Sequence, residues 1–128
     1  MTEQQKKPLA LIIEDAPELV AAFTNALQIA GYETDTATDG QMALAKLQTA
    51  VPHLILLDLH LPHVSGEEVL RTIRADERFA KTRIIFATAD HTNAQYLAAG
   101  RAEFVLLKPV SFKQLRDLAS RLNPQSKQ

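Results

Sequence analysis

The sequence contains no cysteine, and only 4 of its 128 residues are glycine. The lack of cysteine excludes disulfides, thiolate metal sites and a cysteine nucleophile, and it fits a reducing compartment. The few glycines form no phosphate-binding cradle of the nucleotide-binding type. Neither charge is in excess, since 14 basic and 15 acidic residues give a net charge of −1. Proteins that bind nucleic-acid backbones usually carry a basic excess, so direct nucleic-acid binding is not expected.

Long hydrophobic runs are also missing. The apolar run near the N-terminus is interrupted at Glu14 and Asp15, which makes it too short for a signal peptide or a membrane span. With 46% hydrophobic and 23% charged residues, the chain can still bury a core. We therefore expect one soluble, cytoplasmic domain over residues 9–122, with no membrane contact, between a short N-terminal tail (1–8) and a loose, polar C-terminal tail (123–128).

Short, dense apolar runs alternate with amphipathic segments. The runs suit strands that are covered on both faces, and they lie at Leu9–Ile13, Leu54–Leu57, Ile84–Ala87 and Phe104–Leu107, with a weaker strand candidate at Tyr32–Ala37. Helical spacing predicts helices over Pro17–Ala30, Gln41–Ala50, Glu67–Asp76, Asn93–Ala99 and Ser111–Leu122. Such alternation predicts a parallel α/β sheet with helices on both faces, joined by right-handed crossovers.

Three carboxylates, a hydroxyl and an ammonium group follow four of these predicted strands. They belong to Glu14, Asp15, Asp58, Thr88 and Lys108. Because functional groups gather at the carboxyl ends of strands in open α/β sheets, we expect them to converge on one rim. Taken singly, each residue has an ordinary interpretation as a helix-start acid, a turn residue or a satisfied strand hydroxyl. Their joint placement favours a functional site.

The chemistry of such a rim points to phosphoryl transfer. Mg²⁺ takes oxygen ligands and suits two or three carboxylates, which would otherwise repel one another. With the ion in place, Asp58 can stay ionised and act as a nucleophile toward phosphorus. Lys108 and Thr88 could hold the remaining phosphoryl oxygens, since this reaction needs mainly positioning and charge stabilisation.

Four segments resemble the receiver domains of bacterial two-component response regulators, in their single-domain form. They are LIIED (11–15), LILLDLHLPHVSG (54–66), IIFATAD (84–90) and LLKP (106–109). The resemblance extends over about Leu9 to Leu122. It implies a flavodoxin-like, doubly wound sheet of five parallel strands.

The resemblance also implies how the site works. Asp58 would be the phosphoacceptor, Lys108 would contact the phosphoryl group, and Thr88 would be the switch hydroxyl. The Mg²⁺ ligands would be the side chains of Glu14, Asp15 and Asp58 and the backbone carbonyl of His60. The chain would be no enzyme beyond its self-catalysed phosphorylation and dephosphorylation.

Partners follow from the same resemblance. The phosphodonor would be a phosphohistidine on a sensor histidine kinase or a phosphotransfer protein. His60 and Asp90 occupy positions that in the family tune how fast water removes the phosphoryl group. If the 128 residues are the whole protein, output passes through an unidentified downstream protein, and we expect a monomer or weak dimer.

One departure from the family concerns an aromatic residue that often stands three positions before the strand-end lysine. Here that position is Val105, Phe104 lies one place earlier, and Gly100 is one residue farther from Lys108 than usual. Neighbouring strand positions face opposite sides. Either the strand bulges and Phe104 takes the aromatic role, or the role is absent.

Other site types have weaker support. His60 and His63 lack the further ligand spacing of a zinc site, and segment 35–40 lacks the bidentate acid of a calcium loop. A flavin-binding electron carrier would need a hydroxyl- and glycine-rich loop after the first strand, where this chain has EDAPE (14–18). A receiver-like interaction scaffold that is never phosphorylated stays open as an alternative.

Overall fold

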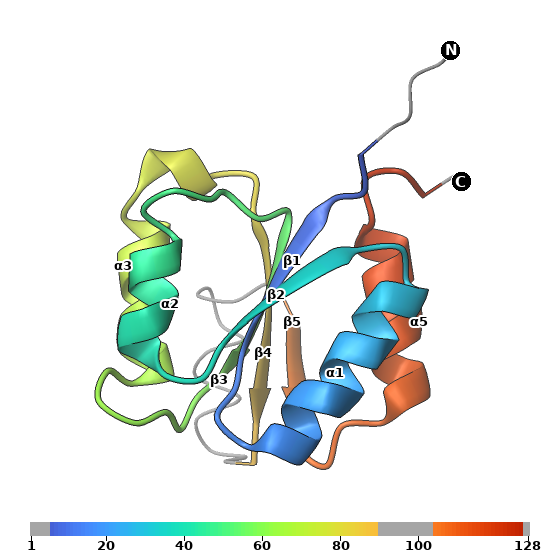
Figure 1. Cartoon of the computed structure of the whole chain (residues 1–128), viewed down its shortest axis with the longest axis horizontal. Helices are drawn as coiled ribbons and strands as arrows, with labels where there is room; N and C mark the ends of the chain where they lie inside the picture. The colour runs from blue at the N-terminus through green and yellow to red at the C-terminus, as the bar shows by residue number, and fades with distance from the viewer. Residues whose placement is uncertain (1–5, 90–103, 127–128) are drawn as a thin grey trace.

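The protein folds around a sheet of five parallel strands, seen in a computed structural model that describes residues 6–89 and 104–126 (Figure 1). The strands are β1 (Leu9–Ile13), β2 (Glu33–Ala37), β3 (Leu54–Asp58), β4 (Arg83–Thr88) and β5 (Phe104–Leu107). Their order across the sheet is β2-β1-β3-β4-β5. The predicted flavodoxin-like, doubly wound α/β fold is confirmed.

Helices cover both faces of this sheet. On one face lie α1 (Pro17–Ile29) and α5 (Phe112–Leu122), and on the other lie α2 (Gly40–Lys46) and α3 (Gly66–Arg74) (Figure 1). A 3-10 turn, η1 (Glu77–Phe79), leads from α3 toward β4. Across the part of the chain that the structure describes, no helix combines the length and the apolar content needed to cross a membrane.

The two helix layers cover two separate cores. Adjacent strand residues point to opposite faces, so each central strand feeds both. In β1, Ile12 packs into the core under α1 and α5, whereas Leu11 and Ile13 pack into the core under α2 and α3. All five residues of β3 are buried. The continuous apolar runs of the sequence therefore mark strands covered on both sides, as predicted.

Helix α3 shows why local sequence was a good guide to most helices. The Ser65 hydroxyl accepts the N–H of Glu68 at 3.1 Å, which caps the helix start. Two acids lie in the first turn and two arginines in the last, in agreement with the helix dipole. Ser111 caps α5 in the same way, through the N–H of Gln114. Each such cap stabilises its helix by about 1 kcal/mol.

Helix α2 is shorter than the predicted range of 41–50, because it ends at Lys46. A distant residue contacts the turn that follows the helix. The guanidinium of Arg78 donates to the carbonyl oxygens of Leu47 at 3.1 Å and Gln48 at 3.4 Å. These bonds satisfy two carbonyls of the turn after α2, whereas the carbonyls of Ala45 and Lys46 accept the N–H groups of Gln48 and Thr49. The predicted helix over 93–99 lies outside the described residues.

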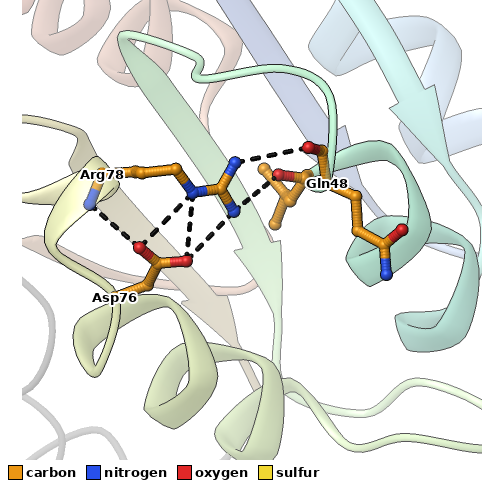
Figure 2. Close-up of polar contacts among 4 residues, drawn as sticks. Gln48, Asp76 and Arg78 are labelled. Atoms are coloured by element: carbon orange, nitrogen blue, oxygen red, sulfur yellow. Dashed lines mark hydrogen bonds and ion pairs between the residues drawn. The ribbon is translucent and has the colours of Figure 1, made fainter.

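Figure 2 shows how Arg78 is held in this position. Its guanidinium lies between the carbonyl of Gln48 and the carboxylate of Asp76, whose Oδ2 is 3.0 Å from Nη2 and 3.2 Å from Nε. The group also lies 4.6 Å from the ring centroid of Phe79. The ion pair lowers the pKa of the Asp76 carboxyl, chiefly through the hydrogen bond from the Arg78 side chain. Arg78 thus ties the end of α2 to η1.

On the opposite face, two side-chain hydrogen bonds link the region just after α1 to α5 and the residue that follows it. The Tyr32 hydroxyl donates to the carbonyl of Ala119 at 2.9 Å, and the Asn123 amide donates to the carbonyl of Ala30 at 3.0 Å. Asn123 opens the segment predicted to be a loose tail, but residues 123–126 form a turn anchored by these contacts.

Candidate functional site

The carboxyl ends of β1 and β3 lie side by side, since Ile13 pairs with Leu57 in the parallel register. Glu14 and Asp15 follow β1 directly, and Asp58 is the last residue of β3. The carboxylates of these three acids each offer an oxygen within 4.8 Å of the other two. The structure therefore brings together the three acids that the sequence placed on one rim.

Two of the three carboxylates are removed from solvent. Glu14 is 2% exposed and Asp58 is 4% exposed, whereas Asp15 faces solvent. Burial raises the pKa of the Glu14 carboxyl, and the charge of Asp58 raises it further. Lys108 and the N–H of Ala16 oppose this rise without cancelling it. Ionising both buried acids is therefore unfavourable unless positive charge is close by.

Lys108 supplies such a charge from the end of the edge strand β5. Its Nζ lies 3.1 Å from Oδ1 of Asp58 and 3.2 Å from Oε1 of Glu14. Burial lowers the pKa of Lys108, but the two carboxylates outweigh burial and raise the pKa above its usual value. The backbone N–H of Lys108 donates to the carbonyl of Thr88 at 2.8 Å, which holds the lysine at the edge of the site.

Thr88 ends β4, between the Asp58 strand and the Lys108 strand. In the register Ala87 pairs with Asp58, and Thr88 pairs with Leu107, the residue before Lys108. Thr88 is completely buried. All five side chains predicted for the rim therefore come from neighbouring strand ends, although their chemical roles stay predictions.

The loop from β3 to α3 begins directly after Asp58. Gly66 closes it, with its N–H donating to the carbonyl of Leu59 at 3.0 Å. A Cβ at Gly66 would lie only 2.0 Å from the carbonyl oxygen of Asp58, so only glycine fits there. His60 is exposed in this loop, and His63 adopts a left-handed conformation with φ of 67°. Sequence reasoning had not found this packing role of Gly66.

The strand register shows on which faces of β5 the side chains of Phe104 and Val105 lie. Ile85 pairs with Phe104 and Phe86 pairs with Val105, and the pairing continues along β5 without a bulge. Phe104 packs against the core under α1 and α5, whereas Val105 packs against the core under α2 and α3. Phe104 therefore faces away from the side that Val105 occupies, and it does not replace the aromatic residue.

Two positions that the family resemblance singled out, Asp90 and Gly100, lie outside the described residues.

Beside the site, a cleft of about 420 Å³ opens next to Lys108. Its lining is mostly apolar and comes from Leu19, Phe23, Ala89, Lys108, Pro109 and Val110. The Lys108–Pro109 peptide bond in this lining is cis.

The donor set fits a hard divalent cation. Carboxylate oxygens are the ligands that Mg²⁺ prefers, and a cation between them would offset the burial that raises the pKa of Glu14. Among the described residues, this acidic trio is the one group of three or more metal-binding side chains. Neither His60 nor His63 belongs to it.

Comparison with known proteins is consistent with this geometry. The sequence profile of the response regulator receiver domain matches residues 10–120. The polar-differentiation response regulator DivK of Brucella ovis is 32% identical over 103 residues, which cover 79% of this chain and 84% of DivK. The chain spans only 7% to 48% of the length of six other curated relatives, among them transcriptional regulators and sensor kinases.

Solved structures show the same likeness. The chemotaxis response regulator CheY4 of Vibrio cholerae superposes with a TM-score of 0.82 at 29% identity, over 91% of this chain and 99% of CheY4. The response regulator TrrA of Thermotoga maritima, solved in complex with Mg²⁺ and BeF, gives a TM-score of 0.79 at 30% identity, over 90% of this chain and 98% of TrrA.

Proposed function

The chain belongs to the response regulator receiver domain family, the phosphoacceptor switches of two-component signalling, and from this premise we propose that Asp58 is the residue that accepts the phosphoryl group. Members of the family are signalling phosphoacceptors and not classical enzymes. The observation that carries the proposal is the surroundings of the Asp58 carboxylate. It is buried at a strand end, with two more carboxylates within 4.8 Å and the Lys108 ammonium 3.1 Å from Oδ1.

The metal in this proposal is Mg²⁺. Its protein ligands would be the carboxylates of Glu14, Asp15 and Asp58 and the backbone carbonyl of His60. Mg²⁺ in the related TrrA structure supports the choice of ion. When bound, the ion would neutralise charge on the carboxylates and on the incoming phosphoryl oxygens. Phosphorylation should then depend strictly on a divalent cation.

The residues of the chain carry out the transfer itself. One carboxylate oxygen of Asp58 forms a bond to phosphorus while the phosphorus–nitrogen bond of the donor phosphohistidine breaks, and the imidazole leaves with the bonding electron pair. Lys108, already beside Asp58, pairs with a phosphoryl oxygen and offsets its charge. Dephosphorylation is a separate step, in which water attacks phosphorus, the bond to the Asp58 oxygen breaks, and inorganic phosphate leaves while Asp58 returns as a free carboxylate. Self-catalysis of both phosphorylation and dephosphorylation is part of the proposal.

The switch would act through the neighbouring strand ends. Phosphorylation adds roughly −1.5 to −2 charges and several acceptor oxygens, which would draw Thr88 and Lys108 toward Asp58. To raise the active form from ~1% to ~99%, the phosphoryl group must favour it by roughly 5.5 kcal/mol. With Val105 in place of an aromatic residue, this switch would move a smaller side chain on the face of α2 and α3.

Receiver domains interact with histidine kinases and phosphotransfer proteins, and we infer that one of these is the phosphodonor of this chain. The unidentified downstream partner would bind the changed face, with the chain as a monomer or weak dimer. The absence of cysteine supports a cytoplasmic location.

Acetyl phosphate provides a direct test of the function. We expect the protein to gain the mass of one phosphoryl group when incubated with acetyl phosphate and Mg²⁺, and not when EDTA replaces Mg²⁺. Asp58→Asn should abolish the gain, because the amide is no nucleophile toward phosphorus. Asp35→Asn is the matched control, since Asp35 lies on β2 and pairs with Lys46 away from the site. An unmodified wild-type protein would favour the interaction scaffold instead.

A further inference from the structure

The corner between β2 and α2, which comprises residues 37–40, contacts two parts of the proposed site. At its start, the carbonyl of Ala37 accepts the N–H of Glu14 at 3.0 Å. At its end, Gly40 opens α2 and lies against Val64 in the loop that follows Asp58. Between them, the Asp39 carboxylate caps α2 by accepting a backbone N–H at 2.7 Å. The corner therefore connects the first acidic strand end with the β3–α3 loop.

The contact at Gly40 leaves no room for a side chain. A Cβ there would lie 2.3 Å from the carbonyl oxygen of Val64 and 2.8 Å from its Cβ. The backbone of Gly40 is not in the left-handed region, so its conformation does not require glycine. Helix propensity would instead favour alanine by up to about 1 kcal/mol. Close packing against Val64 therefore explains why this position is glycine.

The same loop is held at a second point. Gly66 lets the loop close tightly against the carbonyl oxygen of Asp58, which a Cβ would approach to 2.0 Å. His63, next to Val64 in this loop, has a left-handed φ of 67°. This conformation costs a non-glycine residue free energy and persists only where the surroundings impose it. The conformation of the loop is thus set by packing at both Gly40 and Gly66. It carries His60, whose carbonyl is the proposed fourth metal ligand.

We propose that Gly40 is a positioning residue for the metal site. By admitting the Val64 carbonyl against the start of α2, it sets the position of the β3–α3 loop relative to the carboxylates of Glu14 and Asp58. This inference rests on the function proposed above. It extends the working site to an element that contributes no ligand, the corner of β2 and α2.

Gly40→Ala tests the inference, because the added methyl group must push the loop away from α2. Groups that orient metal ligands typically change metal affinity by about 10- to 100-fold when they are altered, and we expect Mg²⁺ to bind Gly40→Ala weaker by a factor in that range. Titration calorimetry measures the affinity. Amide NMR signals of residues 59–66, recorded in EDTA, should shift in the variant and show the displacement of the loop without any metal.

Ala45→Gly is the control for a loss of helix stability. Ala45 is exposed on the same helix, and its replacement should lower the unfolding free energy by roughly 0.5–1 kcal/mol. We expect its Mg²⁺ affinity to stay within about twofold of wild type. Equal weakening of binding by Gly40→Ala and Ala45→Gly would overturn the positioning role, as would an unchanged affinity in Gly40→Ala.

Val64→Gly keeps the test informative if Gly40→Ala does not fold. It removes the partner side chain without a clash, and Val64 is only half-buried. Mg²⁺ binding should again weaken while α2 stays helical, and unchanged binding would count against the proposal. The two proposals fail differently: a wild-type protein that acetyl phosphate does not modify refutes the function, whereas a modified wild type with unaffected variants refutes only the role of Gly40.

Discussion

Replacing Lys108 with methionine removes the charge that the fold places between two buried acids. The Lys108 ammonium lies 3.1 Å from Asp58 and 3.2 Å from Glu14, and its own side chain is 20% exposed. Methionine has a similar length and leaves no large cavity. Lys108→Met therefore isolates the electrostatic part of the interaction in the protein free of divalent cations.

The distances allow the size of the effect to be worked out. At an effective dielectric constant of about 20, each contact has a Coulomb energy of roughly 5 kcal/mol, most of which the desolvation of the ions offsets. Removing one partner of a fully buried ion pair lowers the unfolding free energy by about 3–5 kcal/mol, because the other charge is left uncompensated. Because solvent still reaches part of Lys108, we expect the unfolding free energy to fall by about 2–3 kcal/mol at neutral pH in EDTA.

Urea denaturation followed by circular dichroism measures this loss. Lys113→Met is the matched control, since Lys113 forms a shorter ion pair, 2.8 Å from Asp117, with side chains 76% and 41% exposed. Exposed pairs contribute little, so the control should lose about 0.5 kcal/mol or less. Distance alone would rank the two variants in the opposite order. A loss at Lys113 equal to or larger than that at Lys108 would refute the reasoning.

Mg²⁺ provides a second comparison for the same variant. A cation bound by the native state stabilises it by mass action, and in Lys108→Met it would also replace the missing positive charge. Relative to wild type in the same buffer, saturating Mg²⁺ should therefore restore most of the stability that Lys108→Met loses in EDTA, and leave the small deficit of Lys113→Met unchanged. A Lys108→Met deficit that persists in saturating Mg²⁺ would show that the ion does not replace the charge of Lys108.

Glu14→Gln tests the raised pKa of Glu14. A carboxyl group whose pKa is higher in the folded chain than in the unfolded chain favours folding at low pH. This contribution is lost as the pH rises from the ordinary pKa of 4.5 through the raised pKa. In EDTA the stability of Glu14→Gln relative to wild type should thus increase from about pH 4 to pH 7, and a difference independent of pH would contradict the burial argument. Tyr32→Phe removes the hydrogen bond to the Ala119 carbonyl and should lower the unfolding free energy by about 1 kcal/mol, without changing the yield of phosphorylation. Chemical denaturation and the acetyl phosphate assay measure the two effects, and a changed yield would show that α1 and α5 act on the site.

Much of the fold was predictable because burial leaves a local trace in the sequence. Strands covered on both faces read as continuous apolar runs, and β1 and β5 have the bounds that their runs predicted. Helix starts also depend on nearby residues, since Ser65 and Ser111 accept N–H groups only three positions along the chain. The end of α2 was predicted wrongly, because the apolar spacing continues to residue 50 although the chain turns after Lys46, where the carbonyls of Leu47 and Gln48 bind Arg78 from about 30 positions away.

The candidate site, too, could be predicted only in part from the sequence. The kinds of side chain at each strand end can be read from the sequence, and the rule for open α/β sheets predicts their meeting. Whether Phe104 could replace an aromatic residue at Val105 depended on the register of β4 and β5, which local patterns left open. The two tight glycine contacts also stayed hidden, because each involves the backbone of another segment.

The sequence by itself determined the order of strands and helices and the acids, hydroxyl and ammonium at their ends, because these follow from the chemistry and spacing of neighbouring residues. Only the tertiary structure decided that Glu14 and Asp58 are buried together beside Lys108, and that Gly40 packs against Val64. Such contacts join residues that are far apart in the chain. They depend on strand register and on the packing of helices against the sheet, and both of these are set by the whole core at once.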